Sequence, residues 1–165
     1  MNQKINHISN FGALGGVQSY LMGLKKFSKN DISLYSTRKP ISIYSKECSG
    51  NNISLFNLFD ISLIRKSELF VIHNLILAKS WQILEKSQKI FKKTLIYHEH
   101  GCAWHAPEKD ISKYKKRISK VDCIIVNSNA TANLLNKIYQ IKQEINILRS
   151  PIFIYEDDFK TPLEN

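Results

Sequence analysis

Cysteine is scarce in this chain of 165 residues, and the three cysteines are odd in number and lack the CxxC spacing. Such a set does not supply a disulfide framework, nor a knuckle in which two neighbouring cysteines hold a metal. We therefore expect reduced thiols at Cys48, Cys102 and Cys123.

Long hydrophobic runs are also missing, because no stretch approaches the roughly 20 consecutive apolar residues that a membrane-spanning helix needs. Residues 1–8 are not followed by a small-residue cleavage site, so we expect no secretory signal. Hydrophobic residues make up 43% of the chain and charged residues 23%, which are globular proportions. The length suits one domain rather than two. The sequence therefore predicts a single soluble domain over residues 1–150, located in the cytoplasm.

Acidic residues are few, since 14 Asp and Glu stand against 24 Lys and Arg, which gives a net charge of +10. This balance favours a phosphate-bearing partner or an anionic membrane through long-range attraction. The codon bias of an AT-rich genome explains the same richness in Ile, Lys and Asn without a functional cause. RNP, zinc-finger and helix-turn-helix signals are absent from the sequence, so we expect no nucleic-acid partner.

What the sequence does contain is an alternation of short apolar runs with longer segments of helical spacing. Two of these runs, Leu69–Ile72 and Ile124–Val126, are continuously apolar, which is typical of parallel strands covered on both faces. The pattern predicts an α/β fold with a doubly wound, Rossmann-like parallel sheet. Strands are expected at Lys4–Ser9, Leu69–His73, Thr94–Tyr97, Val121–Val126 and Ile145–Leu148, with short, more exposed strands at Ile41–Tyr44 and Ile53–Phe56.

Helical spacing recurs at Val17–Phe27, Lys109–Val121 and Ala130–Ile138, the last after a predicted N-cap within residues 127–129. The segment Lys109–Val121 is basic around an apolar stripe, and two interpretations follow. The helix either contacts anionic lipid or, as covering helices ordinarily do, buries its stripe against the sheet. Residues 151–165 are acidic and contain proline, which is typical of a linker or tail.

A glycine-bearing turn, Asn10–Leu21, joins the first predicted strand to the first predicted helix. Glycines in such a turn let an anion or a sugar approach the backbone N–H groups at the positive end of the helix. The turn matches neither GxGxxG nor GxxxxGK[ST], so a dinucleotide site or a P-loop is not indicated. A turn with a purely geometric role explains the same glycines.

Four segments, in the same order along the chain, resemble those of family 4 glycosyltransferases. Gly15–Ser19 resembles their opening GGVQ loop, and Ile72–Asn74 is similar to their histidine at the end of a middle strand. Tyr97–Gly101 resembles their Thr-x-His-Gly strand end, and Val121–Thr131 is similar to a segment that begins a late βα unit. Because the four occur together, over about residues 5–135, the match is more specific than any one of them.

The resemblance implies one half of a GT-B enzyme, in which two Rossmann-like domains face each other across a pocket. This chain would be the acceptor-side half, without the C-terminal half that grips most of the nucleotide-sugar. The implied reaction is a retaining, metal-independent transfer from a nucleotide-sugar to a glycan or lipid-linked acceptor, without a cofactor. The resemblance does not extend to the second domain, which carries the donor-phosphate Arg/Lys pair and the Glu-x7-Glu motif in complete enzymes. A non-catalytic module that binds a glycan, an acceptor or a partner protein is therefore the alternative.

The resemblance places His100 near the transferred sugar as the catalytic histidine, with His98 as the second choice. If the strand continues to Glu99, that side chain turns away from both histidines, so we do not expect it to act as a base. The residues predicted to contact donor or acceptor are Gly15, Gly16, Val17, Gln18, His73, His98, Trp104 and Ser128.

Each of these predictions has an ordinary structural alternative. His73 alone is explained as a strand-end histidine bonded to a neighbouring carbonyl, and Trp104 as a core residue. The spacing of His98, His100, Cys102 and His105 allows a zinc site in principle. Because pairs of ligands from separate segments are missing, we expect no metal.

Overall fold

The structure is a computed structural model, and it describes residues 4–12, 15–41, 53–55, 61–74, 78–101 and 108–149. The predictions for Trp104 and for the linker at 151–165 lie outside these residues, as do Cys48, Cys102 and His105. Most of the strand predicted at Ile41–Tyr44 also lies outside them.

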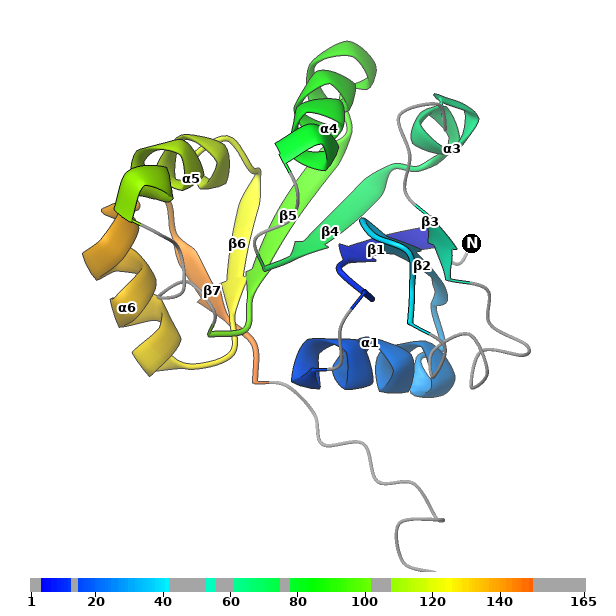
Figure 1. Ribbon diagram of the computed structural model, residues 1–165, viewed down its shortest axis with the longest axis horizontal. Coiled ribbons are helices and arrows are strands. Elements are labelled where there is room, and N and C mark those ends of the chain that lie inside the picture. The colour runs from blue at the N-terminus through cyan, green and yellow to red at the C-terminus, as the bar shows by residue number, and fades with distance from the viewer. Residues whose placement is uncertain are drawn as a thin grey trace, which may run out of the picture.

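Seven parallel strands form one sheet in the order β3-β2-β1-β4-β5-β6-β7 (Figure 1). The chain moves outward from β1 to β3 and then returns to the other side of β1, so the strand order reverses between β1 and β4. This arrangement confirms the predicted doubly wound, Rossmann-like sheet. The strands are β1 (Lys4–Ser9), β2 (Asp31–Ser36), β3 (Ser54–Leu55), β4 (Leu69–His73), β5 (Thr94–Glu99), β6 (Cys123–Val126) and β7 (Ile145–Ile147).

Helices cover both faces of the sheet, because α1 lies on one side and α3, α4 and α5 lie on the other (Figure 1). Leu21 of α1 packs with Ile32 and Leu34 of β2 in one buried cluster. Trp81 of α4 and Leu135 of α6 belong to the larger cluster, together with alternate residues of β4 and β6: Phe70, Ile72, Ile124 and Val126. The helices are α1 (Gly16–Phe27), α3 (Ile61–Lys66), α4 (Ala78–Phe91), α5 (Ile111–Ile118) and α6 (Asn129–Tyr139), with a short 3-10 turn η2 (Glu108–Asp110) before α5.

The apolar stripe of α5 faces the sheet, as the ordinary interpretation of this basic helix predicts. Ile118 is fully buried, while Ile111 and Tyr114 pack against the same core. Arg117, expected among the exposed basic residues, is also buried, and its guanidinium lies 5.7 Å from the ring centroid of Tyr114. None of the helices among the described residues is both long and apolar enough to cross a membrane.

Several strands differ from the sequence predictions, and β7 ends at Ile147, one residue before the predicted Leu148. β2 lies upstream of the two short strands expected in this region. Its alternation, in which Ile32 and Leu34 are buried, is too short to stand out from the surrounding sequence. β5 continues two residues beyond Tyr97 and keeps parallel pairing with β6 through Glu99. β6 begins later than Val121, since the backbone N–H of Val121 still bonds to the carbonyl of Ile118 at the end of α5.

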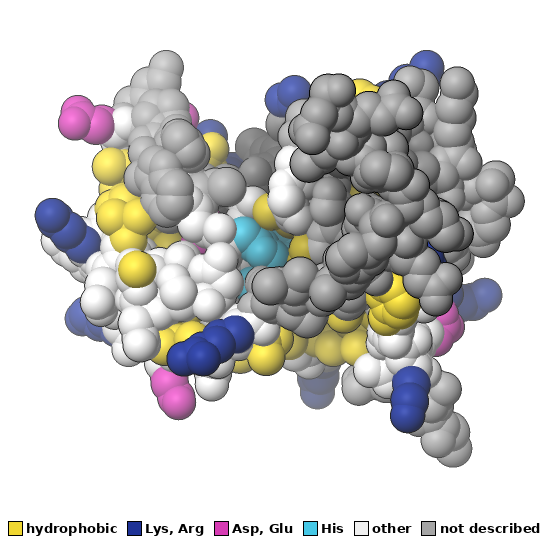
Figure 2. Space-filling model, turned by 90° about the horizontal axis from the view of Figure 1, so that it is seen from below, with side chains coloured by type: hydrophobic (Ala, Val, Ile, Leu, Met, Phe, Trp, Pro, Cys, Tyr) yellow, Lys and Arg dark blue, Asp and Glu magenta, His cyan; other side chains and the backbone are white. Residues whose placement is uncertain are grey.

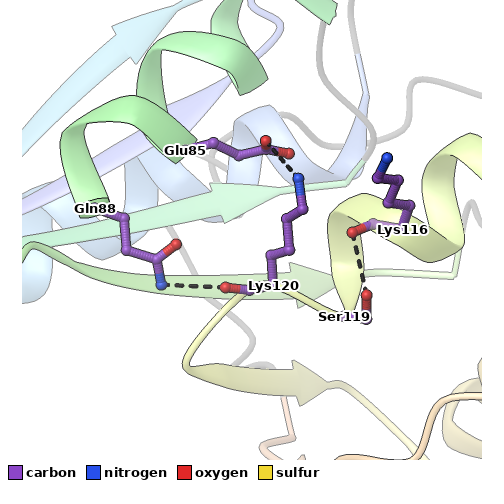
Figure 3. A network of polar contacts seen from close by, with 5 residues as sticks. All are labelled: Glu85, Gln88, Lys116, Ser119 and Lys120. Atoms are coloured by element: carbon purple, nitrogen blue, oxygen red, sulfur yellow. Dashed lines mark hydrogen bonds and ion pairs between the residues drawn. The ribbon is translucent and has the colours of Figure 1, made fainter. Parts of the chain in front are cut away.

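Polar contacts fix the turn between α5 and β6 against α4 (Figure 3). The ammonium of Lys120 lies 2.7 Å from a carboxylate oxygen of Glu85, and Gln88 Nε2 donates to the Lys120 carbonyl at 3.1 Å. Ser119 Oγ donates to the carbonyl of Lys116 at 3.1 Å, which closes the end of α5. These contacts lie at the amino ends of the strands, so the opposite edge of the sheet is left for a binding site.

Candidate functional site

Four histidines gather on one face of the sheet, toward the carboxyl ends of β1, β4 and β5. His7 shares its face with Val71, its register partner, and therefore with His73 two residues later. His73 is in register with His98, and the rings of His98 and His100 stack with centroids 4.0 Å apart. The cluster thus spans the place where the strand order reverses, which is the edge at which open α/β sheets bind ligands.

Hydrogen bonds join three of these imidazoles in a row. His7 Nδ1 lies 2.7 Å from His73 Nε2, and His73 Nδ1 lies 2.9 Å from His100 Nε2. A neutral imidazole donates through one nitrogen and accepts through the other. The tautomer of His73 therefore determines which nitrogens of His7 and His100 carry hydrogen.

The cluster is uncharged near neutral pH. Burial, with repulsion from His98 second, lowers the pKa of His7 to about 4, and burial lowers the pKa of His98 to about 4. Burial is also the main cause that lowers the pKa of His100 to about 3 and the pKa of His73 well below its usual value. Neutral imidazoles can offer hydrogen bonds or bind a metal, but they do not supply positive charge to an anion.

The backbone of His100 and Gly101 is held by side chains at the ends of three strands: Asn74 after β4, Glu99 at the end of β5 and Asn127 after β6. Its N–H donates to Asn74 Oδ1 at 2.9 Å, and Asn127 Nδ2 donates to its carbonyl at 3.3 Å. Gly101, the next residue, has a φ of 101°, a conformation that favours glycine, and its N–H donates to Glu99 Oε1 at 2.8 Å. The position of His100 is therefore fixed on both sides along the chain.

Glu99 is buried on the face of the sheet opposite the histidines. Its carboxylate accepts hydrogen bonds from the hydroxyl of Tyr97, two residues earlier on the same face, and from Gly101. The expectation that this side chain turns away from His98 and His100 is confirmed.

The glycine turn leads into α1, and the two glycines predicted to contact the ligand, Gly15 and Gly16, are exposed. Gly15 precedes the helix with a φ of 177°, which is ordinary extended backbone, and Gly16 is the first helical residue. A Cβ on Gly16 would meet no atom of the described residues within 4 Å, whereas one on Gly15 would lie 2.8 Å from Oε1 of Gln18. Gln18 Nε2 donates to the Asn10 carbonyl at 2.6 Å, so this side chain secures the turn. Neither predicted glycine is required by a left-handed backbone.

Tyr20 connects α1 to the histidines, although no sequence motif indicated it as a site residue. Its ring centroid lies 5.2 Å from that of His100 and 5.8 Å from that of His98. Burial raises the pKa of the Tyr20 hydroxyl. The signal for this residue was its place on the apolar stripe of α1, but that stripe also predicts core packing. His7 was missed because the register between β1 and β4 cannot be inferred from one sequence.

Val17 and Ser128 were also predicted to contact donor or acceptor, and both have structural roles. Val17 packs against the buried cluster beneath α1. Ser128 caps α6, where its Oγ accepts from the backbone N–H of Thr131 at 3.2 Å, as the sequence predicted. It follows Asn127, which contacts the His100 carbonyl, so the capped end of α6 borders the cluster.

Histidine side chains are visible from the surface on the face seen in Figure 2. One ring nitrogen from each of His73, His98 and His100 lies within 4.8 Å of the others, so within the described part of the chain these three form a group that can hold a metal. His100 is only partly buried, so it is the member through which a ligand can reach the cluster.

No protein-family model and no curated protein matches the chain. Two solved structures of Alr3699/HepE from Anabaena, one in complex with UDP-glucose and one with UDP and glucose, have a similar fold. Their TM-scores are 0.67 and 0.70 at 12% and 13% sequence identity, and the likeness covers 92% of this chain. The chain spans 44% and 45% of those chains, which is less than half of their length. This likeness confirms the fold expected for one half of a GT-B protein.

Proposed function

We propose that the chain is the acceptor-side half of a glycosyltransferase similar to family 4. In this proposal the histidine face lines the pocket where a nucleotide-sugar meets its acceptor. The supporting observation is a cluster of neutral histidines in contact with Tyr20 of α1, the helix that follows the glycine turn, at the carboxyl edge of a sheet whose fold resembles HepE. Both HepE structures hold UDP-glucose or its two parts, which makes UDP-sugars the first donors to test.

His100 is the residue proposed to contact the transferred sugar. Its Nε2 faces His73, so Nδ1 is the nitrogen available to a ligand. Because the ring is neutral near pH 7, it can exchange a hydrogen bond with a sugar hydroxyl without first losing a proton. The bonds to Asn74 and Asn127 hold the residue in place before the ligand arrives.

Gly15 and Gly16 are proposed to admit the diphosphate or the acceptor. The first N–H groups of a helix have no partner within the helix, and the helix dipole adds partial positive charge at this end. Both glycines are exposed, and the space beside Gly16 is free of other atoms of the described chain within 4 Å. An anion can therefore approach the start of α1 closely.

The rest of the proposal concerns the complete system. A second domain would supply most donor contacts, since the chain spans less than half of HepE. We further propose a retaining transfer to a glycan or lipid-linked acceptor at the inner face of a membrane. The net charge of +10, with exposed Lys113 and Lys116 on α5, would favour contact with anionic lipid.

Binding to the chain itself tests the proposal first. Titration with UDP-glucose, followed by NMR, is expected to shift the amides of Gly15 and Gly16 and the imidazole of His100. His100→Gln is expected to weaken binding about threefold to tenfold, the usual value of one hydrogen bond. Ser119→Ala, at the opposite edge of the sheet, serves as the control and leaves the affinity unchanged. Saturating UDP-glucose that shifts none of these signals would overturn the proposal.

Transfer is tested with a donor-side GT-B domain supplied in trans. The expected result is sugar incorporation into a glycan acceptor, with a lower kcat in His100→Gln. Equal transfer by this variant would remove His100 from the mechanism. Acceptor binding without transfer would instead support a non-catalytic binding module.

A further inference from the structure

The histidine cluster has the ligand set of a transition-metal site. Neighbouring strands supply its members, His73 from the end of β4 and His98 and His100 from the end of β5, and one nitrogen of each lies within 4.8 Å of the others. Zinc binds imidazole nitrogen at about 2.0–2.1 Å, so two ligands of a tetrahedral site lie about 3.3 Å apart. The 2.9 Å between His73 Nδ1 and His100 Nε2 is close to that separation, so a small outward movement would admit the ion.

His98 contributes a nitrogen that lacks a partner among the described residues. Its side chain is 3% exposed, and its Nε2 is buried without a hydrogen bond. A buried polar nitrogen in this condition costs free energy, because water no longer solvates it and no protein atom replaces the water. A bound cation would satisfy this nitrogen.

His7 occupies the position of a supporting residue behind the cluster. Its Nδ1 lies 2.7 Å from His73 Nε2. If His73 binds a metal through Nδ1, its Nε2 carries hydrogen and donates it to His7. Metal-bound histidines usually make such a bond through their second nitrogen, since it fixes the tautomer and the ring orientation.

We propose that His73, His98 and His100 bind one divalent cation of the zinc class, with His7 positioning His73. The bound atoms are His73 Nδ1, His98 Nε2 and His100 Nε2, and the fourth tetrahedral position is left to water or to an oxygen of another ligand. A set made only of imidazoles selects zinc, nickel or copper over magnesium or calcium, which prefer oxygen.

This site differs from the one that the sequence spacing suggested. The sequence placed His98 and His100 with Cys102 and His105 and offered no second segment of ligands. Parallel pairing of β4 with β5 supplies that segment through His73, which is in register with His98. The proposal does not depend on sugar transfer, because it concerns only the binding of the ion.

Zinc titration of the untagged chain, after removal of metal with a chelator, tests the site by calorimetry. One zinc ion per chain is expected. His73→Gln, His98→Gln and His100→Gln are each expected to weaken binding by at least about tenfold, and His7→Gln by about tenfold as a supporting residue. Cys102→Ser and His105→Gln are the matched controls, and both are expected to bind zinc like the parent chain.

The proposal is overturned by any of three results. These are the lack of stoichiometric binding, undiminished affinity in both His98→Gln and His100→Gln, or affinity that depends on Cys102 or His105 but not on His73. Circular dichroism in the presence of chelator checks that each variant is folded. If a variant is unfolded, the imidazole ¹⁵N signals of the parent chain identify the ligands, and a zinc-dependent shift confined to His105 also overturns the proposal.

Discussion

At the scale of single residues, the protonation of the histidines in the cluster depends on whether the chain is folded. His7, His73 and His98 are buried, His100 is partly so, and burial is the main cause that lowers the pKa of each. An unfolded chain exposes the same side chains to water, where the pKa of histidine is about 6.5. Protons therefore bind preferentially to the unfolded chain below that pH.

We predict that the free energy of unfolding is constant above about pH 7 and falls as the pH drops from about 6.5 to 5. The unfolded histidines take up protons in this window, whereas His7 and His98 stay neutral until about pH 4 when folded. Each such histidine contributes up to about 1.4 kcal/mol per pH unit.

Urea unfolding in the presence of chelator, at intervals from pH 8 to 5, measures this dependence. His73→Gln removes one of the titrating groups and is expected to make the slope shallower. A slope that is equal in the parent chain and the variant would contradict the prediction.

Gly101 and Gly16 should respond oppositely to substitution by alanine. Gly101 has a φ of 101°, where a side chain is strained, so Gly101→Ala is expected to destabilise the fold by about 1–2 kcal/mol. Gly16 begins α1 in open space, so Gly16→Ala is expected to leave stability equal or slightly higher. Thermal unfolding of the two variants compares them, and equal losses would show that the left-handed backbone of Gly101 is not the cause.

At the scale of elements, the sequence predicted the bounds of two strands, one an alternation of apolar and polar residues and the other a continuous apolar run. The predicted bounds Lys4–Ser9 and Leu69–His73 are those of β1 and β4. β2 was missed because it contributes only Ile32 and Leu34 to one core, while polar residues alternate with them. Strand ends set by hydrogen bonds to other elements, as at the start of β6, are not encoded in a local pattern.

The candidate site was predictable only in part for a related reason. His73 ends β4, while His98 and His100 lie just before and just after the last residue of β5, and the carboxyl ends of parallel strands meet at one edge. His7 and Tyr20 join them through the packing of β1 and α1, which depends on contacts between distant parts of the chain. No spacing within one segment can express such contacts.

The N-cap of α6 gives a prediction at this scale. Ser128→Ala removes the oxygen that accepts from Thr131, so we expect a loss of about 1 kcal/mol in the free energy of unfolding. Asn133→Ala, at an exposed position of the same helix, is the control and is expected to be neutral or stabilising. Urea denaturation measures both, and a loss that is no larger for Ser128→Ala than for the control would contradict the capping role.

At the scale of the whole molecule, positive side chains outnumber negative ones, which gives a net charge of +10. With 24 basic and 14 acidic side chains, repulsion among like charges opposes the compact state. We predict that Tm rises when NaCl is raised from low to moderate concentration, because salt screens this repulsion. A gain of about 1 kcal/mol would correspond to about 2–4 °C.

The double variant Lys113→Gln and Lys116→Gln removes two exposed positive charges from α5. Its Tm is expected to depend less on NaCl than that of the parent chain. A thermal melt series in NaCl measures the difference, and a Tm that falls with salt in the parent chain would show that attractive pairs dominate instead.

The bond between His7 and His73 has a consequence for how the molecule assembles. These residues are 66 positions apart. Their strands, β1 and β4, pair with each other and so join the two halves of the sheet. Within each half, paired strands are closer along the chain. Closing so long a loop carries the largest entropic cost among the strand pairings, so it is expected late in folding. The row of imidazoles is therefore completed only when the two halves have docked, and below about pH 6.5 this step releases the protons that the unfolded histidines carry.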